Sequence, residues 1–198
     1  KKLHIISYGY NFNYFKNYKF KKKNYKKINF LIIGRFVKSK RSELSIEFFD
    51  KLKFKNIQKK LFILGDGPLK KKLQIQYKNN RLIKFLGYKK NAQNFIKNSD
   101  ILIHFSKTES FGHVVLESAL QEKTIFACNN VGTFNYYIKN KKNGFLVPRK
   151  DPVGAALKIF RNNDLRKIIN IGNGLNKLVK SKFDINNTWV QYKKILKN

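Results

Sequence analysis

The chain is almost without sulfur: it holds a single cysteine, Cys128, and no methionine, even at position 1. A lone cysteine excludes an internal disulfide and a cysteine-based zinc site, which fits a reducing compartment such as the cytoplasm. The missing first methionine leads us to expect a processed chain or a piece of a longer protein. No apolar run approaches the roughly 20 residues of a membrane-spanning helix. With 42% hydrophobic residues in 198, however, the chain can form a proper core.

Acidic residues are scarce as well: 11 stand against 44 basic ones, which gives a net charge of +33. Only six of the basic residues are arginines, and the lysines are spread along the chain beside an excess of Asn, Ile, Phe and Tyr. These residue types share A/T-rich codons, so genome base composition accounts for the charge without any ligand. Nucleic-acid surfaces favour arginine and cluster their charge on one face. We therefore expect no nucleic-acid partner, although the basic surface could contact an anionic membrane or an acidic partner.

Short continuous apolar runs alternate with segments of helical spacing, joined by glycine-bearing turns, as in parallel strands with connecting helices. The predicted strands are Asn29–Ile33, Leu61–Leu64, Leu82–Leu86, Ile101–Phe105, Thr124–Cys128 and Phe145–Val147. The predicted helices are Leu44–Leu52, Leu69–Tyr77, Ala92–Lys97, Val114–Leu120, Pro152–Phe160, Leu165–Leu178 and Ile185–Leu196. This order predicts a doubly wound α/β fold with a mostly parallel sheet and C-terminal helices. We expect residues 1–27 to be a tail or linker and residues 28–198 to be the domain.

Two predicted strand ends carry loops with candidate chemistry, although a plain turn is the alternative for the second. Gly34 and Arg35 close the first strand and Lys40 follows five residues later, so two cations could converge above the sheet. A solvated loop is the alternative in so lysine-rich a chain. The second strand ends in the tight turn Gly65–Pro68 (GDGP), which opens a helix. This turn matches neither a G-x-G-x-x-G fingerprint nor a Walker loop.

The most informative stretch is TESFGHVVLE, which begins at Thr108 and places two carboxylates eight positions apart. Glu109 precedes a predicted helix, and Glu117 lies about a turn and a half inside it. Gly112 lets the backbone approach a ligand beside free N–H groups at the helix start. Two acids that face a polyol, beside donors for an anion, suit a nucleotide-sugar; two solvated glutamates are the alternative.

The histidines give no sign of a metal site. His4, His104 and His113 lack metal-ligand spacing, and the sequence contains no Asp-x-Asp pair. His104 lies inside an apolar strand, where we expect a core or rim residue rather than a ligand. The sequence therefore predicts no metal.

Taken together and in this order, the motifs resemble the C-terminal half of a family 4 glycosyltransferase with the GT-B architecture. The matching segments are LIIGRFVKSK, LFILGDGPL, IKFLGY, SDILIHFSKTESFGHVVLESA, NVGTFNYYI and NGFLVP. The resemblance runs from about Leu31 to the end of the chain. In addition, Ile5–Phe15 resembles the family segment that leads out of the N-terminal domain. The implied fold is one Rossmann-like half of a two-domain enzyme.

The resemblance implies a role for each matching residue. Arg35 and Lys40 match residues that bind the donor diphosphate and neutralise the leaving nucleotide. Glu109 matches a catalytic or positioning residue at the donor sugar, and Glu117 matches a residue that holds the ribose hydroxyls. We thus assign catalytic roles to Glu109, Arg35 and Lys40. Donor-binding roles are assigned to Gly34, Asp66, Gly67, Tyr88, Phe111, Gly112, His113, Val114, Glu117 and Thr133.

The activity implied is sugar transfer from a nucleoside diphosphate sugar, with retention of configuration and without a metal or other cofactor. The acceptor would be a glycan or lipid-linked molecule, held by an N-terminal domain that is missing from this chain. The setting implied is cell-envelope polysaccharide synthesis in the cytoplasm, with peripheral contact at the inner face of the membrane.

Two positions depart from the family pattern. Ser110 replaces a glycine, as other members tolerate, and Tyr136 stands where members carry a glutamate, so a sugar hydroxyl contact is lost or altered. One alternative is therefore a non-catalytic or degenerate nucleotide-sugar-binding domain. A basic nucleic-acid-binding α/β domain is the other.

Overall fold

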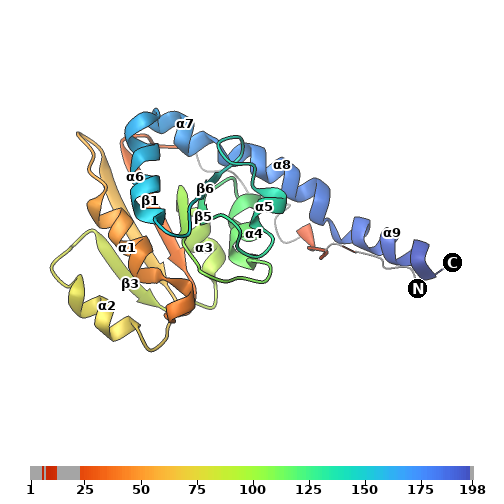
Figure 1. Cartoon of the computed structure of the whole chain (residues 1–198), viewed down its shortest axis with the longest axis horizontal. Helices are drawn as coiled ribbons and strands as arrows, with labels where there is room; N and C mark the ends of the chain where they lie inside the picture. The colour runs from red at the N-terminus through yellow and green to blue at the C-terminus, as the bar shows by residue number, and fades with distance from the viewer. Residues whose placement is uncertain (1–5, 7, 13–22, 197–198) are drawn as a thin grey trace.

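The computed structural model describes residues 6, 8–12 and 23–196 (Figure 1). Its centre is a six-stranded sheet in the order β3-β2-β1-β4-β5-β6, with parallel pairing between all neighbouring strands. The strands are β1 (Lys27–Ile33), β2 (Gln58–Leu64), β3 (Ile83–Gly87), β4 (Ile101–His104), β5 (Thr124–Cys128) and β6 (Phe145–Val147). The predicted doubly wound α/β fold is confirmed.

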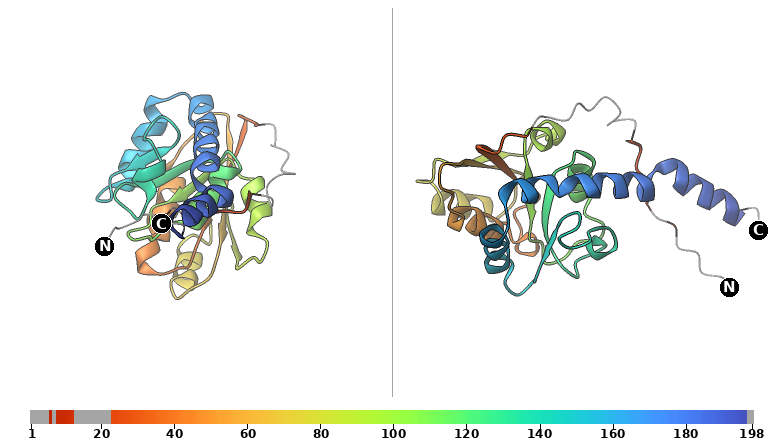
Figure 2. Two further views of the ribbon diagram at one scale, coloured as in Figure 1. Left: turned by 90° about the vertical axis from the view of Figure 1, so that its right-hand side faces the viewer. Right: turned by 90° about the horizontal axis from the view of Figure 1, so that it is seen from above.

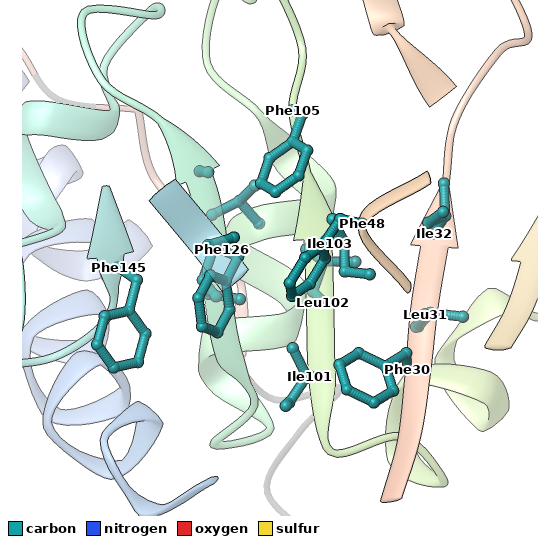
Figure 3. Packing of buried hydrophobic residues seen from close by; sticks show 14 of the residues in the cluster. Phe30, Leu31, Ile32, Phe48, Ile101, Leu102, Ile103, Phe105, Phe126 and Phe145 are labelled. Carbon is teal, nitrogen blue, oxygen red and sulfur yellow. The ribbon is translucent and has the colours of Figure 1, made fainter. Parts of the chain in front are cut away.

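The central strands are apolar throughout because both faces of the sheet are covered. Every residue of β4 and β5 is buried. Figure 3 shows apolar side chains of these strands, such as Ile103 and Phe126, in one cluster with those of β1. The centre of the Phe126 ring lies 4.6 Å from the centre of the Phe145 ring and 5.4 Å from that of the Phe160 ring. Burial of each such side chain contributes about 1.5–3 kcal/mol, so the core holds the strand ends firmly.

The helices divide between the two faces of the sheet (Figure 2). They are α1 (Ser42–Lys51), α2 (Lys70–Gln76), α3 (Ala92–Lys97), α4 (His113–Leu120), α5 (Phe134–Tyr137), α6 (Pro152–Asn162), α7 (Leu165–Asn170), α8 (Gly172–Phe183) and α9 (Ile185–Leu196). α1 packs on α6 through the rings of Phe48 and Phe160, 5.7 Å apart, whereas α4 packs on α8. The chain winds outward from β1 to β3, then returns to β4 and winds the other way, so the strand order reverses between β1 and β4. Ligands of such folds bind at this reversal.

The C-terminal region differs from the prediction in one respect: the helix expected over Leu165–Leu178 is divided into α7 and α8. Ile171 lies between them with helical backbone angles, and the N–H of Gly174 donates to its carbonyl in a tighter turn, at 3.3 Å. Gly172 lies close to the carbonyl of Lys123, which a Cβ would approach within 2.5 Å. The apolar pattern continues through Ile171, so spacing alone could not place this bend.

Helix α9 extends away from the body of the domain (Figures 1 and 2). None of its described residues is buried, and its large apolar side chains are exposed: Ile185, Trp189, Val190, Tyr192 and Leu196. The fold therefore leaves one apolar helix face uncovered by the described part of the chain. Among the described residues, no helix is both long enough and apolar enough to cross a membrane.

Candidate active site

A cleft of ≈ 690 Å³ opens at the carboxyl ends of β1, β2 and β3, beside the reversal of strand order. This volume lies in the usual range for small-molecule sites. Six of the residues predicted from the sequence line the cleft: Gly34, Arg35, Asp66, Gly67, Tyr88 and Glu117. The loops after three different strands thus meet around one hollow.

Glycines form the cleft wall where the loops after β1 and β2 touch. Gly65 has a φ of +130°, and a Cβ there would lie 1.9 Å from the carbonyl oxygen of Gly34. Gly67 leaves little more room, since its Cβ would meet neighbouring backbone at 2.8 Å. Asp66 between them accepts from Lys70 Nζ at 2.7 Å, and this hydrogen bond lowers the pKa of the Asp66 carboxyl. A ligand would meet mainly backbone along this wall.

A charged cluster joins the loop after β1 to the loop after β4. Lys40 Nζ forms an ion pair with Glu109 Oε1. The same oxygen lies 2.7 Å from His104 Nε2 and 3.2 Å from Ser106 Oγ. Arg35, in contrast, is exposed and lines the cleft. The structure therefore brings a predicted phosphate-binding lysine into contact with the predicted catalytic carboxylate.

The ionisation of Glu109 is set by two opposed effects. Burial of the carboxyl raises its pKa, but hydrogen bonds and charge from His104 and Lys40 outweigh burial and lower the pKa to about 2. Glu109 is thus a carboxylate at neutral pH. Because a carboxylate only accepts hydrogen bonds, Nε2 of His104 carries the hydrogen that joins them.

The lowered pKa of Glu109 predicts a loss of stability in acid. A carboxyl with a folded-state pKa below its ordinary value of 4.5 stabilises the fold above that pH. The contribution disappears as the pH falls toward the folded-state pKa. We expect Glu109→Gln to remove this contribution, so that stability falls less between about pH 5 and pH 2 than in the wild type. Urea unfolding across this range measures the difference.

Glu47→Gln is the matched control, because Glu47 pairs with Lys51 on an exposed helix surface. Exposed pairs contribute only about 0–1 kcal/mol. An acid dependence of Glu109→Gln equal to that of the wild type would contradict the partly buried ion pair.

The start of α4 provides free donors next to Glu109. Gly112 precedes the helix with a φ of +76°, and no side chain caps the first turn. A Cβ at Gly112 would lie 2.3 Å from the ring of Phe134, so only glycine fits there. In the part of the chain that the structure describes, the N–H groups of His113 and Val114 make no hydrogen bond. These groups, together with the helix dipole, favour an anion.

Glu117 faces the cleft from inside α4 and has different partners from Glu109. The hydroxyl of Tyr10 lies 3.5 Å from Glu117 Oε1 and 2.9 Å from His113 Nδ1. Burial raises the pKa of Glu117, although His113, Gln93 and Tyr10 each oppose the shift. The two carboxylates of the motif therefore occupy different surroundings.

The short segment 8–12 lies against the start of α4, although most of the predicted linker falls outside the described residues. The ring of Tyr8 lies 5.2 Å from that of Phe111 and 5.3 Å from that of His113. Tyr10 is fixed by its main chain, which donates to Phe183 at 2.6 Å and accepts from Ile185 at 3.0 Å. This segment is thus part of the site's surroundings.

The loop after β5 supports the loop that carries Glu109. Thr133 Oγ1 donates to the carbonyl of Phe111 at 3.2 Å. Gly132 has a φ of +48°, and a Cβ there would lie 2.5 Å from the carbonyl oxygen of Glu109. Tyr136 is 51% exposed, and Lys182 Nζ lies 4.1 Å from the centre of its ring. Position 136 therefore carries an aromatic ring where the resemblance implies an acid.

We expect Gly132→Ala to destabilise the fold, because the added methyl group meets the Glu109 loop and φ is positive. Strain of this kind costs about 1–3 kcal/mol. Gly174→Ala is the matched control: it lies within α8, where its Cβ would be 3.4 Å from the nearest atom. In a helix, alanine stabilises the fold by about 0.5–1 kcal/mol relative to glycine. Urea unfolding of the two variants should give shifts of opposite sign, and equal shifts would contradict the contact.

Three parts of the site are not predicted from the sequence. The sequence predicts that His104 is a core or rim residue. Its contact with Glu109 forms because the loop after β4 folds back onto the end of that strand. Tyr10 reaches Glu117 from 107 positions away. Lys89 and Gln93 line the cleft after β3, where the sequence predicts Tyr88 alone. For Lys89, the signal is its position just after the end of β3, whereas Gln93 lies inside α3.

The strand order and the helices on both faces define a doubly wound α/β domain, with cations and carboxylates in the loops at the carboxyl ends of its strands. The chain matches the family described as "Glycosyl transferases group 1" over residues 14–169. It belongs to this family.

Known relatives support this assignment. The N-acetyl-alpha-D-glucosaminyl L-malate synthase of Bacillus anthracis is 28% identical over 179 residues, which cover 82% of this chain and 43% of the relative. A glycosyltransferase from Rickettsia africae superposes with a TM-score of 0.76 at 23% identity, over 98% of this chain and 57% of that one. Anabaena HepE in complex with UDP and glucose superposes with a TM-score of 0.74 at 20% identity, over 87% of this chain and 48% of that one. The chain thus spans about half the length of these proteins.

Proposed function

We propose that this chain is the donor-binding, C-terminal half of a family 4 glycosyltransferase with the GT-B architecture. The observation that carries the proposal is the ion pair between Lys40 and Glu109, which joins the loop after β1 to the loop before α4. Lys40 would bind a phosphate and Glu109 would face a sugar, and the two side chains are in direct contact. The domain would take a nucleoside diphosphate sugar, as the UDP complex of HepE suggests.

Each part of the donor has a matching group. Arg35 and Lys40 would bind the diphosphate with the N–H groups of His113 and Val114, since charge-assisted hydrogen bonds favour phosphate. Glu117 would accept hydrogen bonds from the ribose hydroxyls, and Tyr88, which is 76% exposed at the cleft, would contact the base. The sugar would then lie toward Glu109.

Glu109 suits a reaction in which the anomeric carbon becomes positively charged. It is ionised at neutral pH, and its carboxylate would interact more strongly with the transition state than with the bound donor. The cations and the α4 dipole would stabilise the departing diphosphate. We propose that transfer proceeds with retention of the anomeric configuration and without a metal or other cofactor.

We expect transfer without a divalent metal. In the described residues, no group of three or more His, Cys, Asp or Glu side chains could hold one. Arg35 and Lys40 would neutralise the diphosphate instead. EDTA should therefore leave both UDP binding and transfer within about twofold of their values without it, a difference of about 0.4 kcal/mol. Loss of activity in EDTA and its recovery with Mn²⁺ would contradict this prediction.

The acceptor would be a glycan or a lipid-linked molecule bound by an N-terminal domain. The exposed apolar face of α9 supports this arrangement because it offers a surface for a second domain to cover. The excess of lysine would favour peripheral contact with the anionic inner face of a membrane, from the cytoplasm. Nucleic acid is not among the proposed partners.

Calorimetric titration of the chain with UDP, UDP-sugars and UMP tests the proposal. We expect saturable binding of UDP and UDP-sugars, and weaker binding of UMP, which lacks the second phosphate. Transfer by this chain alone should be slow. Absence of UDP binding would overturn the proposal, as would salt-sensitive binding of RNA that UDP does not compete with.

A donor-binding domain without transfer activity is the second candidate. Tyr136 favours it, because its ring contacts Lys182 and lies 6.3 Å from the ring of Phe183. A carboxylate that would bind a sugar hydroxyl is therefore missing at this position. Donor binding without transfer by a protein that also carries the acceptor half would support this candidate.

A further inference from the structure

The contact between Lys40 and Glu109 conflicts with the role that the proposed function gives to Lys40. Lys40 is paired with Glu109 in the structure, yet the proposed function requires Lys40 to bind the donor diphosphate. The Glu109 side chain is only 11% exposed, and a largely buried carboxylate that loses a charged partner is destabilised. A second donor must therefore hold Glu109 if Lys40 is to move toward the diphosphate.

We propose that His104 is a positioning residue that holds Glu109 in place and so leaves Lys40 free to bind the donor diphosphate. This inference rests on the proposed function, but its structural part, the coupling of His104 to Glu109, can be measured without a nucleotide. His104 itself would touch neither the sugar nor the phosphate.

His104 is the most rigid of the donors to Glu109. It ends β4, a strand that pairs with β1 on one side and with β5 on the other. Its side chain is 6% exposed, and its ring meets the Phe134 ring edge-on at 5.6 Å. The Nε2–Oε1 distance of 2.7 Å is that of a charge-assisted hydrogen bond. The core thus fixes the ring, and the ring fixes the carboxylate.

Ser106 cannot replace His104 in this role. Its hydroxyl lies 3.2 Å from Glu109 Oε1, 3.2 Å from the carbonyl of Thr108 and 3.3 Å from the carbonyl of Ser39. One hydroxyl has a single hydrogen to donate, so these acceptors compete for it. Glu109 receives at most a shared hydrogen bond from Ser106.

Lys40 is the flexible member of the cluster. Its side chain is 26% exposed, and an ammonium on a four-carbon stem can turn to another anion at small cost. In the described residues, the hydrogen bonds to Glu109 all fall on Oε1, which leaves Oε2 for a ligand. With His104 present, Lys40 can turn away while Oε1 stays hydrogen-bonded. Without it, Lys40 would be held by the carboxylate.

A double-mutant cycle on UDP affinity tests this coupling in the full chain. We expect His104→Leu, which removes the donor but keeps an apolar side chain in the core, to weaken UDP binding about tenfold. In the Glu109→Gln background the carboxylate no longer competes for Lys40, so His104→Leu should change UDP affinity less than twofold. His104→Gln, whose amide can place a donor near the Nε2 position, should stay within about threefold of the wild type.

A purely structural role for His104 predicts equal losses of UDP affinity in both backgrounds, and that result would overturn the proposal. So would an unchanged UDP affinity in His104→Leu. Carbon-13 NMR titration of the Glu109 carboxyl is the second measurement and needs no ligand. Its pKa should rise in His104→Leu and return toward the wild-type value in His104→Gln.

The two measurements distinguish the two possible failures. Lack of UDP binding by the wild type, with the NMR shifts as expected, would refute the proposed function and keep the His104–Glu109 coupling. Wild-type UDP binding with a Glu109 pKa that does not respond to His104→Leu would refute the positioning role alone.

Discussion

Glu109→Gln is expected to lower kcat at least tenfold while changing the donor KM much less. Glutamine keeps the size of the side chain but not its charge, so it cannot stabilise positive charge at the anomeric carbon. A contribution made mainly in the transition state lowers kcat rather than raising KM. The assay needs the two-domain enzyme that the proposed function requires, with donor and acceptor varied separately.

Glu47→Gln is the control, since Glu47 makes an exposed pair with Lys51 on α1. It should leave both constants unchanged. A kcat for Glu109→Gln within about threefold of the wild type would rule out a catalytic role, because a tenfold loss corresponds to about 1.4 kcal/mol. Glu117→Ala should behave differently and mainly raise the donor KM. The ribose contacts are equally strong in the bound donor and in the transition state, so their loss leaves kcat nearly unchanged.

Arg35→Ala is expected to weaken UDP binding about tenfold to a hundredfold. Arg35 is exposed in the cleft at the carboxyl end of β1, next to the wall formed by Gly34 and Gly65. A hydrogen bond to a charged group contributes about 1.5–3 kcal/mol, and each 1.4 kcal/mol is a factor of about ten in affinity. Calorimetric titration of the chain with UDP measures the change.

Arg161→Ala separates the local contact from the overall charge. Arg161 is exposed in the last turn of α6, so its loss lowers the net charge by the same amount away from the cleft. At moderate salt, distant surface charges are screened, and this variant should bind UDP like the wild type. Equal weakening by both substitutions would mean that UDP responds only to total charge.

The fold could be predicted because the sheet is covered on both faces. Central strands such as Thr124–Cys128 then appear as short, unbroken apolar runs, and glycines mark their ends. The bend at Ile171 could not be predicted, since it depends on how Gly172 meets the carbonyl of Lys123. The short helix α5 was missed for a similar reason: four residues carry too little periodicity to detect.

Residues that line the cleft could be predicted where they lie just after the end of a predicted strand. Arg35, Asp66 and Tyr88 were found in this way and line one cleft in the structure. The contacts of Glu109 with His104 and of Glu117 with Tyr10 were not, because they depend on side-chain directions that the sequence does not show. The sequence of an apolar strand with one histidine is the same whether the histidine ring only packs in the core or is hydrogen-bonded to a carboxylate.

The central claim is that a nucleoside diphosphate sugar binds in the cleft at the carboxyl ends of β1, β2 and β3, which Glu117 of α4 also lines. A crystal structure of the chain with UDP tests this claim most directly. We predict the diphosphate within hydrogen-bonding distance of Arg35 and of the His113 N–H, and the ribose hydroxyls on Glu117. UDP bound elsewhere, or an empty cleft at saturating UDP, would contradict the account.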